Sequence, residues 1–230
     1  MKNCLKKIYI IVLVFVMFLV NCNYASVTLN QLRGKEHDFA NTYRNFGVGP
    51  DYILSGDLLV LGDSFSFLLC EYADAELNYI VHQGYTLQQI LDEFIEEIPR
   101  DRYKYIYLYI GPNDFFAQTN PVDFRVALQI IVNKLKFRGA QVILSNYTEP
   151  DYTSSYAKGT IDNKIKCKEY DLEIWQTAQQ NDLIYVDTSD LLKQYGRIRV
   201  DGIHPSREMY NPLLIKVLNE IILDAKKRVG

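Results

Sequence analysis

The sequence predicts an α/β protein, a three-layer α/β/α sandwich around a five-stranded parallel sheet in the flavodoxin-like order 2-1-3-4-5. Short apolar runs of the kind that form buried strands alternate along the chain with segments of helical period. No repeat, linker or low-complexity tract divides them. In such a sheet the carboxyl ends of the strands share one edge, and a ligand crevice is expected outside that edge.

Five runs predict the strands. The first, Leu58–Leu61, is continuously apolar and runs into Gly62, as expected of a strand that is buried on both faces. In the third, tyrosines from Tyr103 to Tyr109 alternate with aliphatic residues, so we expect both faces of this strand to be covered and the strand to be central. The other strands are expected at Asn78–Val81, Gln141–Leu144 and Leu183–Val186.

Helical signals lie between these strands. A cap at Thr86 precedes apolar residues from Leu87 to Ile98 at i, i+3, i+4, i+7 and i+8, which predicts an amphipathic helix. Asn120-Pro121 begins a second helix, with proline at its first position, and Gly139 lies just past its end. Further helices are expected at Phe65–Ala73, around Cys167 and from Asn211-Pro212 onward.

Residues 1–26 predict a targeting segment rather than part of the fold. Lysines precede thirteen unbroken apolar residues, Ile8 to Val20, which suit a secretory signal and fall short of the roughly 20 residues of a spanning helix. Three outcomes stay open: a lipid on Cys22 within a lipoprotein-like box, cleavage after Ala25 or Ser26, and an uncleaved anchor. Each places residues 27–230 beyond the cytoplasmic membrane as one domain, secreted or anchored at its outer side, which meets the membrane only through this segment or that lipid.

Composition argues against two classes of partner. With 25 basic and 28 acidic residues the formal net charge is −3, so the chain lacks the basic surface with which nucleic-acid-binding proteins displace counterions. Its four cysteines and three histidines form no CxxC pair and no other metal-ligand spacing. We therefore expect no nucleic-acid partner, no metal ion and no cofactor.

Residues that suit acyl transfer follow the predicted strands at their shared edge. They are Gly62-Asp63-Ser64 after the first strand, Gly84 after the second, Asn113 after the third, and Asp201 and His204 after the fifth. Acyl transfer needs a hydroxyl nucleophile, an imidazole to take its proton, a carboxylate to fix the imidazole tautomer, and N–H donors for an oxyanion. Each residue alone could be a helix cap or a turn former, but together they predict this chemistry.

These residues resemble the blocks of the SGNH, or GDSL, hydrolase family of serine esterases and lipases. Gly62-Asp63-Ser64, Gly84, Gly111-x-Asn113-Asp114 and Asp201-x-x-His204 occur in the family's order, and the resemblance covers about residues 57–220. It implies that Ser64 is the nucleophile, His204 the general base and Asp201 its orienting carboxylate. It also implies an oxyanion hole formed by the backbone N–H groups of Ser64 and Gly84 and the side chain of Asn113. No GxSxG elbow is present, which argues against the α/β-hydrolase alternative.

Three residues in or beside these blocks differ from the usual pattern or have an ambiguous role. Phe65 stands where the family usually has leucine, and Gly84 is a lone glycine identified partly by its place after the second strand. His82 lies near the same edge but has no acid at matching spacing, which favours a structural role over a catalytic one.

We therefore predict an exported serine ester hydrolase that removes an acetyl or another short acyl group from an envelope or extracellular carbohydrate through an acyl-enzyme. Tyr147, Tyr152 and Tyr156, after the fourth strand, are candidates for a substrate-binding loop, with buried packing an equal alternative. Three other functions stay open: a lipid or lysophospholipid esterase, an O-acyltransferase that uses the same serine, and, from another class, a non-catalytic binding module.

The topology also makes a prediction about the cysteines. In the order 2-1-3-4-5, right-handed crossovers place the helices that carry Cys70 and Cys167 on opposite faces of the sheet. A disulfide requires Cα atoms within roughly 7 Å of each other. We therefore expect two free and mostly buried thiols in spite of export.

Overall fold

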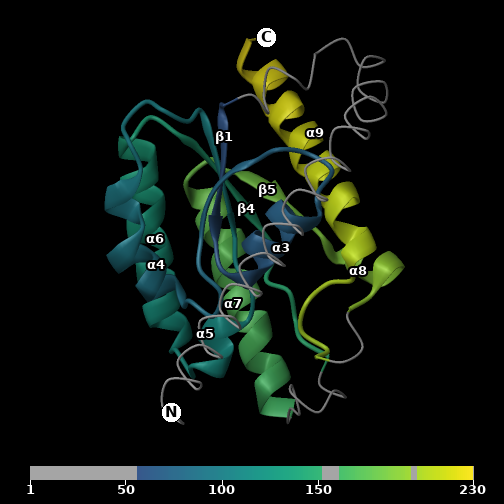
Figure 1. The fold of residues 1–230 in the computed structure, drawn as a ribbon. Coiled ribbons are helices and arrows are strands. Elements are labelled where there is room, and N and C mark those ends of the chain that lie inside the picture. Colours follow the sequence, from purple (N-terminus) through teal and green to yellow (C-terminus); the bar gives the residue numbers. More distant parts are fainter. Residues whose placement is uncertain (1–55, 152–160, 198–200, 230) are drawn as a thin grey trace, which may run out of the picture. The chain divides into compact units, whose positions relative to one another are not determined.

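The computed structural model describes residues 56–151, 161–197 and 201–229, all within one compact unit of the chain (Figure 1). The expected targeting segment, residues 1–26, lies outside the described residues. None of the helices in the described ranges is long and apolar enough to cross a membrane.

A parallel sheet forms the middle layer. Its strands are β1 (Leu58–Gly62), β2 (Asn78–Val81), β3 (Tyr105–Tyr109), β4 (Gln141–Ser145) and β5 (Ile184–Val186). They pair in the order β2-β1-β3-β4-β5, and every pairing is parallel, which confirms the predicted topology. Gly62 at the end of β1 pairs with Val81 of β2 and with Tyr109 of β3. The three strands therefore end level, and the residues that follow them start side by side.

Helices cover both faces of the sheet (Figure 1). On one face lie α3 (Ser64–Tyr72) and α9 (Tyr210–Val229), and on the other lie α4 (Leu87–Glu93), α6 (Pro121–Phe137) and α7 (Ile161–Gln180). The shorter elements are η1 (Ile95–Glu97), α5 (Asn113–Phe116), α8 (Ser189–Tyr195) and η2 (Arg207–Met209).

The alternation in β3 has the predicted consequence. Tyr107 and Tyr109 are fully buried, and their rings stack 5.4 Å apart. The Tyr109 ring also meets Phe65 of α3 edge-on at 5.5 Å, so these tyrosines face the α3 layer. Ile106 and Leu108 are buried in the core on the opposite face, with residues of α4, α6 and α7. The strand is therefore covered on both sides and central, as its pattern indicated.

The helix predicted over Leu87–Ile98 is divided in two. Helix α4 ends at Glu93, and Phe94 leads into the 3₁₀ turn η1. Ile95 and Ile98 are nonetheless buried. The apolar spacing is satisfied because the tighter turn keeps both isoleucines on the core side, so the pattern located the buried face correctly but not the end of the α-helix.

The two described cysteines lie as predicted. Cys70 belongs to α3 and Cys167 to α7, on opposite faces of the sheet, and no disulfide joins them. Cys167 is buried and Cys70 is half-buried. Burial raises the pKa of the Cys70 thiol to about 12, so this cysteine is a poor nucleophile at neutral pH.

Candidate active site

Ser64 is the first residue of α3, and only Asp63 separates it from the end of β1. Asp63 caps the helix, because its carboxylate Oδ1 accepts a hydrogen bond from the backbone N–H of Phe65 at 2.9 Å. The first N–H groups of a helix have no intrahelical acceptor, and the helix dipole favours negative charge there. The fold therefore places a serine hydroxyl and its own N–H where an oxyanion is stabilised.

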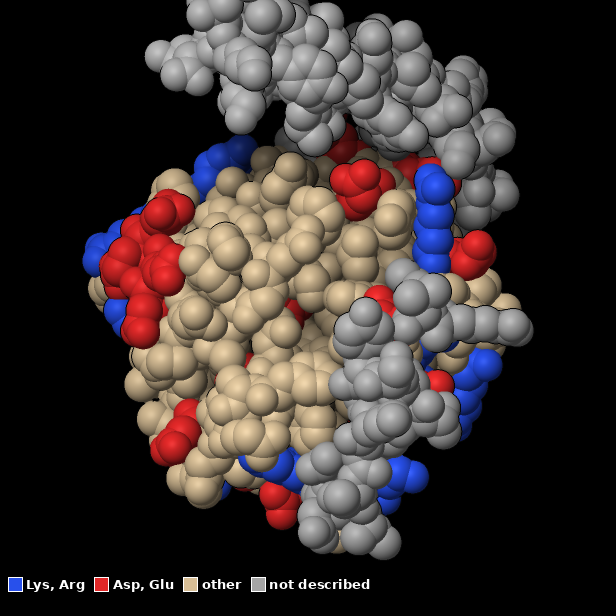
Figure 2. Space-filling model, turned by 60° about the horizontal axis from the view of Figure 1, so that its bottom comes forward, with Lys and Arg blue, Asp and Glu red and all other residues tan. Residues whose placement is uncertain are grey.

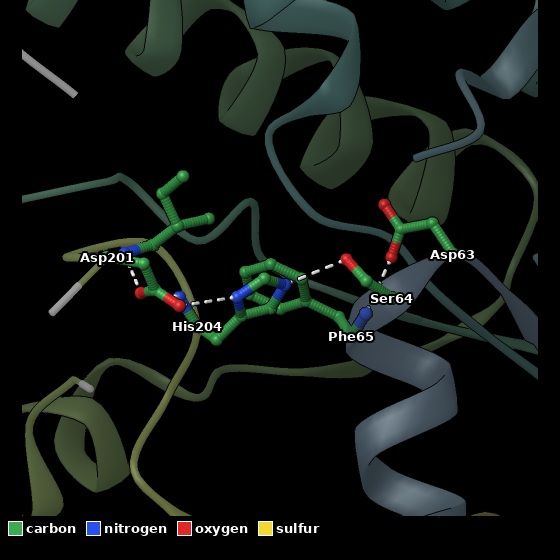
Figure 3. Close-up of polar contacts among 6 residues, drawn as sticks. Asp63, Ser64, Phe65, Asp201 and His204 are labelled. Carbon is green, nitrogen blue, oxygen red and sulfur yellow. Dashed lines mark hydrogen bonds and ion pairs between the residues drawn. The ribbon is translucent and has the colours of Figure 1, made fainter. Parts of the chain in front are cut away.

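Ser64, His204 and Asp201 form a continuous hydrogen-bonded relay (Figure 3). The imidazole Nδ1 lies 2.9 Å from Asp201 Oδ2, and Nε2 lies 2.9 Å from Ser64 Oγ. Because a carboxylate can only accept, the shared proton belongs to Nδ1. This leaves the lone pair of Nε2 free to accept the hydroxyl proton of Ser64. The geometry is that of a nucleophile, a base and an orienting acid.

Asp201 is held as an ionised carboxylate. Its Oδ1 accepts the backbone N–H groups of Ile203 at 2.7 Å and His204 at 3.1 Å. Partial burial raises the pKa of Asp201, but the hydrogen bonds from the His204 ring and from these two N–H groups outweigh it, and the pKa lies below its usual value. A negative charge beside His204 at neutral pH stabilises the imidazolium that forms during proton transfer.

Asp63 links the Gly62-Asp63-Ser64 block to the Gly111-x-Asn113-Asp114 block. It is 1% exposed, and its Oδ2 accepts the N–H of Gly111 at 2.8 Å and Asn113 Nδ2 at 2.7 Å. Burial raises the pKa of Asp63 to about 7, while the bonds from Gly111, Phe65 and Asn113 act in the opposite direction. Sequence reasoning identified Asp63 only as a cap. Its partners lie 48 and 50 residues further along the chain, and the only available signal was its place inside the GDS block.

Asn113 begins α5, and its amide already has two acceptors. Besides Asp63 Oδ2, its Nδ2 donates to the backbone carbonyl of Tyr85 at 3.0 Å. An amide nitrogen carries two protons, so a third acceptor must share one of them. An oxyanion would therefore share the proton that faces the Tyr85 carbonyl, which is the longer of the two contacts.

Gly84 lies in the turn between β2 and α4 with φ +82°, a conformation that glycine adopts without strain. A side chain at this position would meet no atom within 4 Å, so the space beside Gly84 is open. The start of this turn lies beside the chain that leads to Ser64, because the N–H of His82 donates to the carbonyl of Gly62 at 3.1 Å.

Gly111 and Phe65 pack against each other behind the relay. A Cβ on Gly111 would lie 2.2 Å from the ring of Phe65, so only glycine fits beside this phenylalanine. The Phe65 ring is fully buried, with its centroid 5.2 Å from that of His204. The phenylalanine that stands in place of the family's usual leucine therefore packs against the imidazole, in addition to the hydrogen bond that His204 Nδ1 donates to Asp201.

Two other sequence candidates do not lie at the relay. Tyr147 is 3% exposed, and its ring packs with Phe124 of α6 and Tyr170 of α7, so the expectation of a substrate-binding role is wrong for this residue. Tyr147 is the second residue after the end of β4, and there the α6–α7 layer covers it. His82 is exposed, stacks on Tyr85 and has its Nδ1 near the Gln83 carbonyl, which agrees with a structural role. Tyr152 and Tyr156 lie outside the described residues.

No cluster of three His, Cys, Asp or Glu side chains that could hold a metal ion occurs in the described ranges. The groups that the structure brings together at the strand ends are a hydroxyl, an imidazole, carboxylates and amide N–H donors. These groups can carry out acyl transfer through a covalent serine intermediate.

Comparisons with known proteins agree with this geometry. Residues 60–211 match the model of the GDSL-like Lipase/Acylhydrolase family. A GDSL-like lipase from Bacteroides thetaiotaomicron has 17% sequence identity and a TM-score of 0.61, over 73% of this chain and 88% of that chain. A putative acylhydrolase from Bacteroides fragilis has 18% identity and a TM-score of 0.62, over 73% and 86%. An acetylxylan esterase from Geobacillus stearothermophilus has 17% identity and a TM-score of 0.51, over 73% and 94%. No curated protein matches the chain.

Proposed function

Because the chain belongs to the GDSL-like lipase/acylhydrolase family and is a hydrolase of carboxylic esters, we propose that it works through a Ser64–His204–Asp201 triad as an exported enzyme that removes acetyl or other short acyl groups from carbohydrate. The observation that carries the triad is the unbroken relay from Asp201 through both ring nitrogens of His204 to Ser64 Oγ. A serine that merely capped a helix would not need an oriented imidazole at hydrogen-bonding distance.

In the proposed reaction Ser64 Oγ attacks the carbonyl carbon of the ester while its proton passes to His204 Nε2. His204 then returns that proton to the oxygen of the leaving alcohol, the ester C–O bond breaks, and the acyl group stays on Ser64. A water molecule next loses a proton to His204 and attacks the acyl carbon. His204 then gives that proton to Ser64 Oγ as the bond between Oγ and the acyl carbon breaks, which releases the carboxylic acid and restores the Ser64 hydroxyl. Asp201 holds the imidazole tautomer throughout.

The oxyanion of each tetrahedral intermediate would meet three donors in this proposal. They are the N–H of Ser64 at the start of α3, the N–H of Gly84 beside open space, and the Asn113 proton that faces the Tyr85 carbonyl. Donors fixed before the reaction lower the barrier because they need no reorganisation when charge develops.

Three observations support a short acyl group on a neutral carbohydrate. Figure 2 brings forward the end of the molecule that carries α5, and the part of this face that is not covered by grey atoms is mostly tan around a hollow, with most of its visible Lys, Arg, Asp and Glu toward the edges. Such a surface suits an uncharged substrate better than an ionic one. One structural neighbour is an acetylxylan esterase, and the apolar segment Ile8–Val20 predicts export to where polysaccharides lie.

A chain-length series of p-nitrophenyl esters, from acetate to dodecanoate, measured beside acetylated xylan tests the proposal. We expect the highest kcat/KM on acetate, release of acetate from the polysaccharide, and loss of both activities in Ser64→Ala. Preference for long acyl chains would indicate a lipid esterase. Transfer of the acyl group to an added sugar rather than to water would indicate an acyltransferase.

A further inference from the structure

We propose that Tyr85 is a positioning residue for the oxyanion hole, which fixes the turn that carries Gly84 with its ring and orients the Asn113 amide with its carbonyl. The inference rests on the donor roles proposed above for Gly84 and Asn113. Tyr85 itself does not contact the reacting atoms in this account.

The turn that carries Gly84 has little packing of its own. His82, Gln83 and Gly84 are exposed, and a side chain at Gly84 would meet nothing within 4 Å. The backbone bond inside the turn, from the N–H of Tyr85 to the carbonyl of His82, is long at 3.4 Å. The position of the Gly84 N–H relative to Ser64 therefore depends on contacts made by the neighbours of Gly84.

The Tyr85 ring supplies those contacts. It stacks on His82 with ring centroids 3.9 Å apart, and on Phe94 with centroids 5.3 Å apart and planes inclined by 17°. Its hydroxyl donates to Glu93 Oε2 at 2.5 Å. Glu93 is the last residue of α4 and Phe94 its C-cap, so the ring ties the start of the turn, at His82, to the far end of the helix that the turn leads into.

The Tyr85 backbone connects the same turn to Asn113 at the start of α5. Its carbonyl accepts a hydrogen bond from Asn113 Nδ2 at 3.0 Å. The same Nδ2 donates its other hydrogen bond to Asp63 Oδ2 at 2.7 Å. Two acceptors in fixed positions define the plane of the amide. Two residues further on, the N–H of Leu87 donates to Asp114 Oδ2 at 2.9 Å, so the start of α4 and the start of α5 are held together. Two of the three proposed donors thus take their positions from contacts of Tyr85.

This arrangement predicts a specific kinetic signature. An oxyanion donor that moves by about 1 Å loses transition-state stabilisation while substrate binding changes little, and such misplacement costs up to roughly a hundredfold in rate. We therefore expect Tyr85→Ala to lower kcat about 10- to 100-fold on p-nitrophenyl acetate, with KM within about threefold of wild type. Tyr85→Phe keeps both ring stacks and loses only the bond to Glu93, so it should stay within about threefold of wild-type kcat.

The experiment compares Tyr85→Ala, Tyr85→Phe and His82→Ala with Tyr79→Ala, which removes an exposed tyrosine from β2 and serves as the matched control. Besides kcat and KM, the rate of phosphonylation of Ser64 by an ethyl fluorophosphonate is measured, because its phosphoryl oxygen would occupy the oxyanion hole without turnover. We expect this rate to fall in Tyr85→Ala in parallel with kcat, to fall less in His82→Ala, and to stay unchanged in the control.

Three outcomes would overturn the proposal. In the first, a folded Tyr85→Ala enzyme keeps kcat within threefold of wild type. In the second, KM rises while kcat is unchanged, which would make the stack a substrate contact. In the third, Tyr85→Ala does not fold, and His82→Ala, which changes an exposed residue, keeps the wild-type kcat and the wild-type rate of phosphonylation. Failure of the proposed function looks different, because Ser64→Ala would then retain activity whatever the Tyr85 variants do.

Discussion

At the scale of single residues, Asn113 separates a catalytic role from a structural one. Its amide donates to Asp63 and to the Tyr85 carbonyl, and the proposed oxyanion would share the second proton. Asn113→Ala should lower kcat by about 10²–10³ with KM little changed, because the lost donor acts mainly in the transition state. Loss of the hydrogen bonds alone should lower the melting temperature by only a few degrees. A variant that melts several degrees lower yet turns over within threefold of wild type would refute the oxyanion role.

Asp63 makes a prediction about stability and pH. Its carboxyl is buried, and burial raises its pKa from 3.8 to about 7. The folded state therefore holds this proton more tightly than the unfolded state does. The resulting stabilisation is complete below about pH 4 and is lost as the pH rises toward 7, by an amount on the order of 4 kcal/mol.

The variant Asp63→Asn tests this linkage. The amide of this variant cannot titrate. Its NH₂ group would face the N–H donors whose hydrogen bonds the Asp63 carboxylate accepts, so the variant should be less stable than wild type. Urea unfolding of both proteins at pH 4, 5.5 and 7 gives the difference in the free energy of unfolding, which should shrink as the pH rises. A difference that stays constant or grows over this range would show that Asp63 is ionised throughout.

At the scale of elements, the fit of α3 against the end of β3 sets the position of the imidazole. Gly111→Ala would place a Cβ 2.2 Å from the Phe65 ring, which is fully buried and lies against His204. We expect this substitution to cost roughly 1–3 kcal/mol of stability through overpacking and to lower kcat by displacing His204. Phe65→Leu, which restores the residue usual in the family, should relieve part of the strain. A double-mutant cycle on the melting curves in which the two changes are additive would contradict this packing account.

Sequence reasoning predicted the elements well where a period was long enough to show. The i, i+3, i+4 spacing from Leu87 identified the buried face of α4 and η1 but not the break at Phe94, because a 3₁₀ turn keeps Ile95 and Ile98 on that same face. Helices α5 and α8, of four and seven residues, contain too few turns to display a period. Local sequence patterns therefore do not predict such short helices.

At the scale of the whole molecule, the strand order separates the two described cysteines. Cys70 and Cys167 lie on helices that cover opposite faces of the sheet, and no disulfide joins them. Alkylation of the unfolded, unreduced protein followed by peptide mass spectrometry should find both cysteines modified. A Cys70–Cys167 bridge in the same experiment would be incompatible with the order β2-β1-β3-β4-β5.

The candidate site was predictable to the extent that it depends on the ends of parallel strands. Ser64, His204 and Asp201 were placed at one edge from the strand pattern alone, and the structure joins them by hydrogen bonds. The contacts of Asp63 with Gly111 and of Asn113 with Tyr85 depend on side-chain directions across the sheet, which no spacing in the sequence encodes. Tyr147 shows the same limit, because only the packing of α6 and α7 reveals that its ring is buried.

In the proposed mechanism Ser64 forms the covalent bond with the acyl group and His204 activates Ser64. Incubation of the purified protein with a fluorophosphonate, followed by peptide mass spectrometry, tests this most directly. We expect one adduct, located on Ser64, that forms at least about a hundredfold more slowly in His204→Ala and is absent from Ser64→Ala. An adduct on another residue, or no adduct on a folded wild-type protein, would contradict this mechanism.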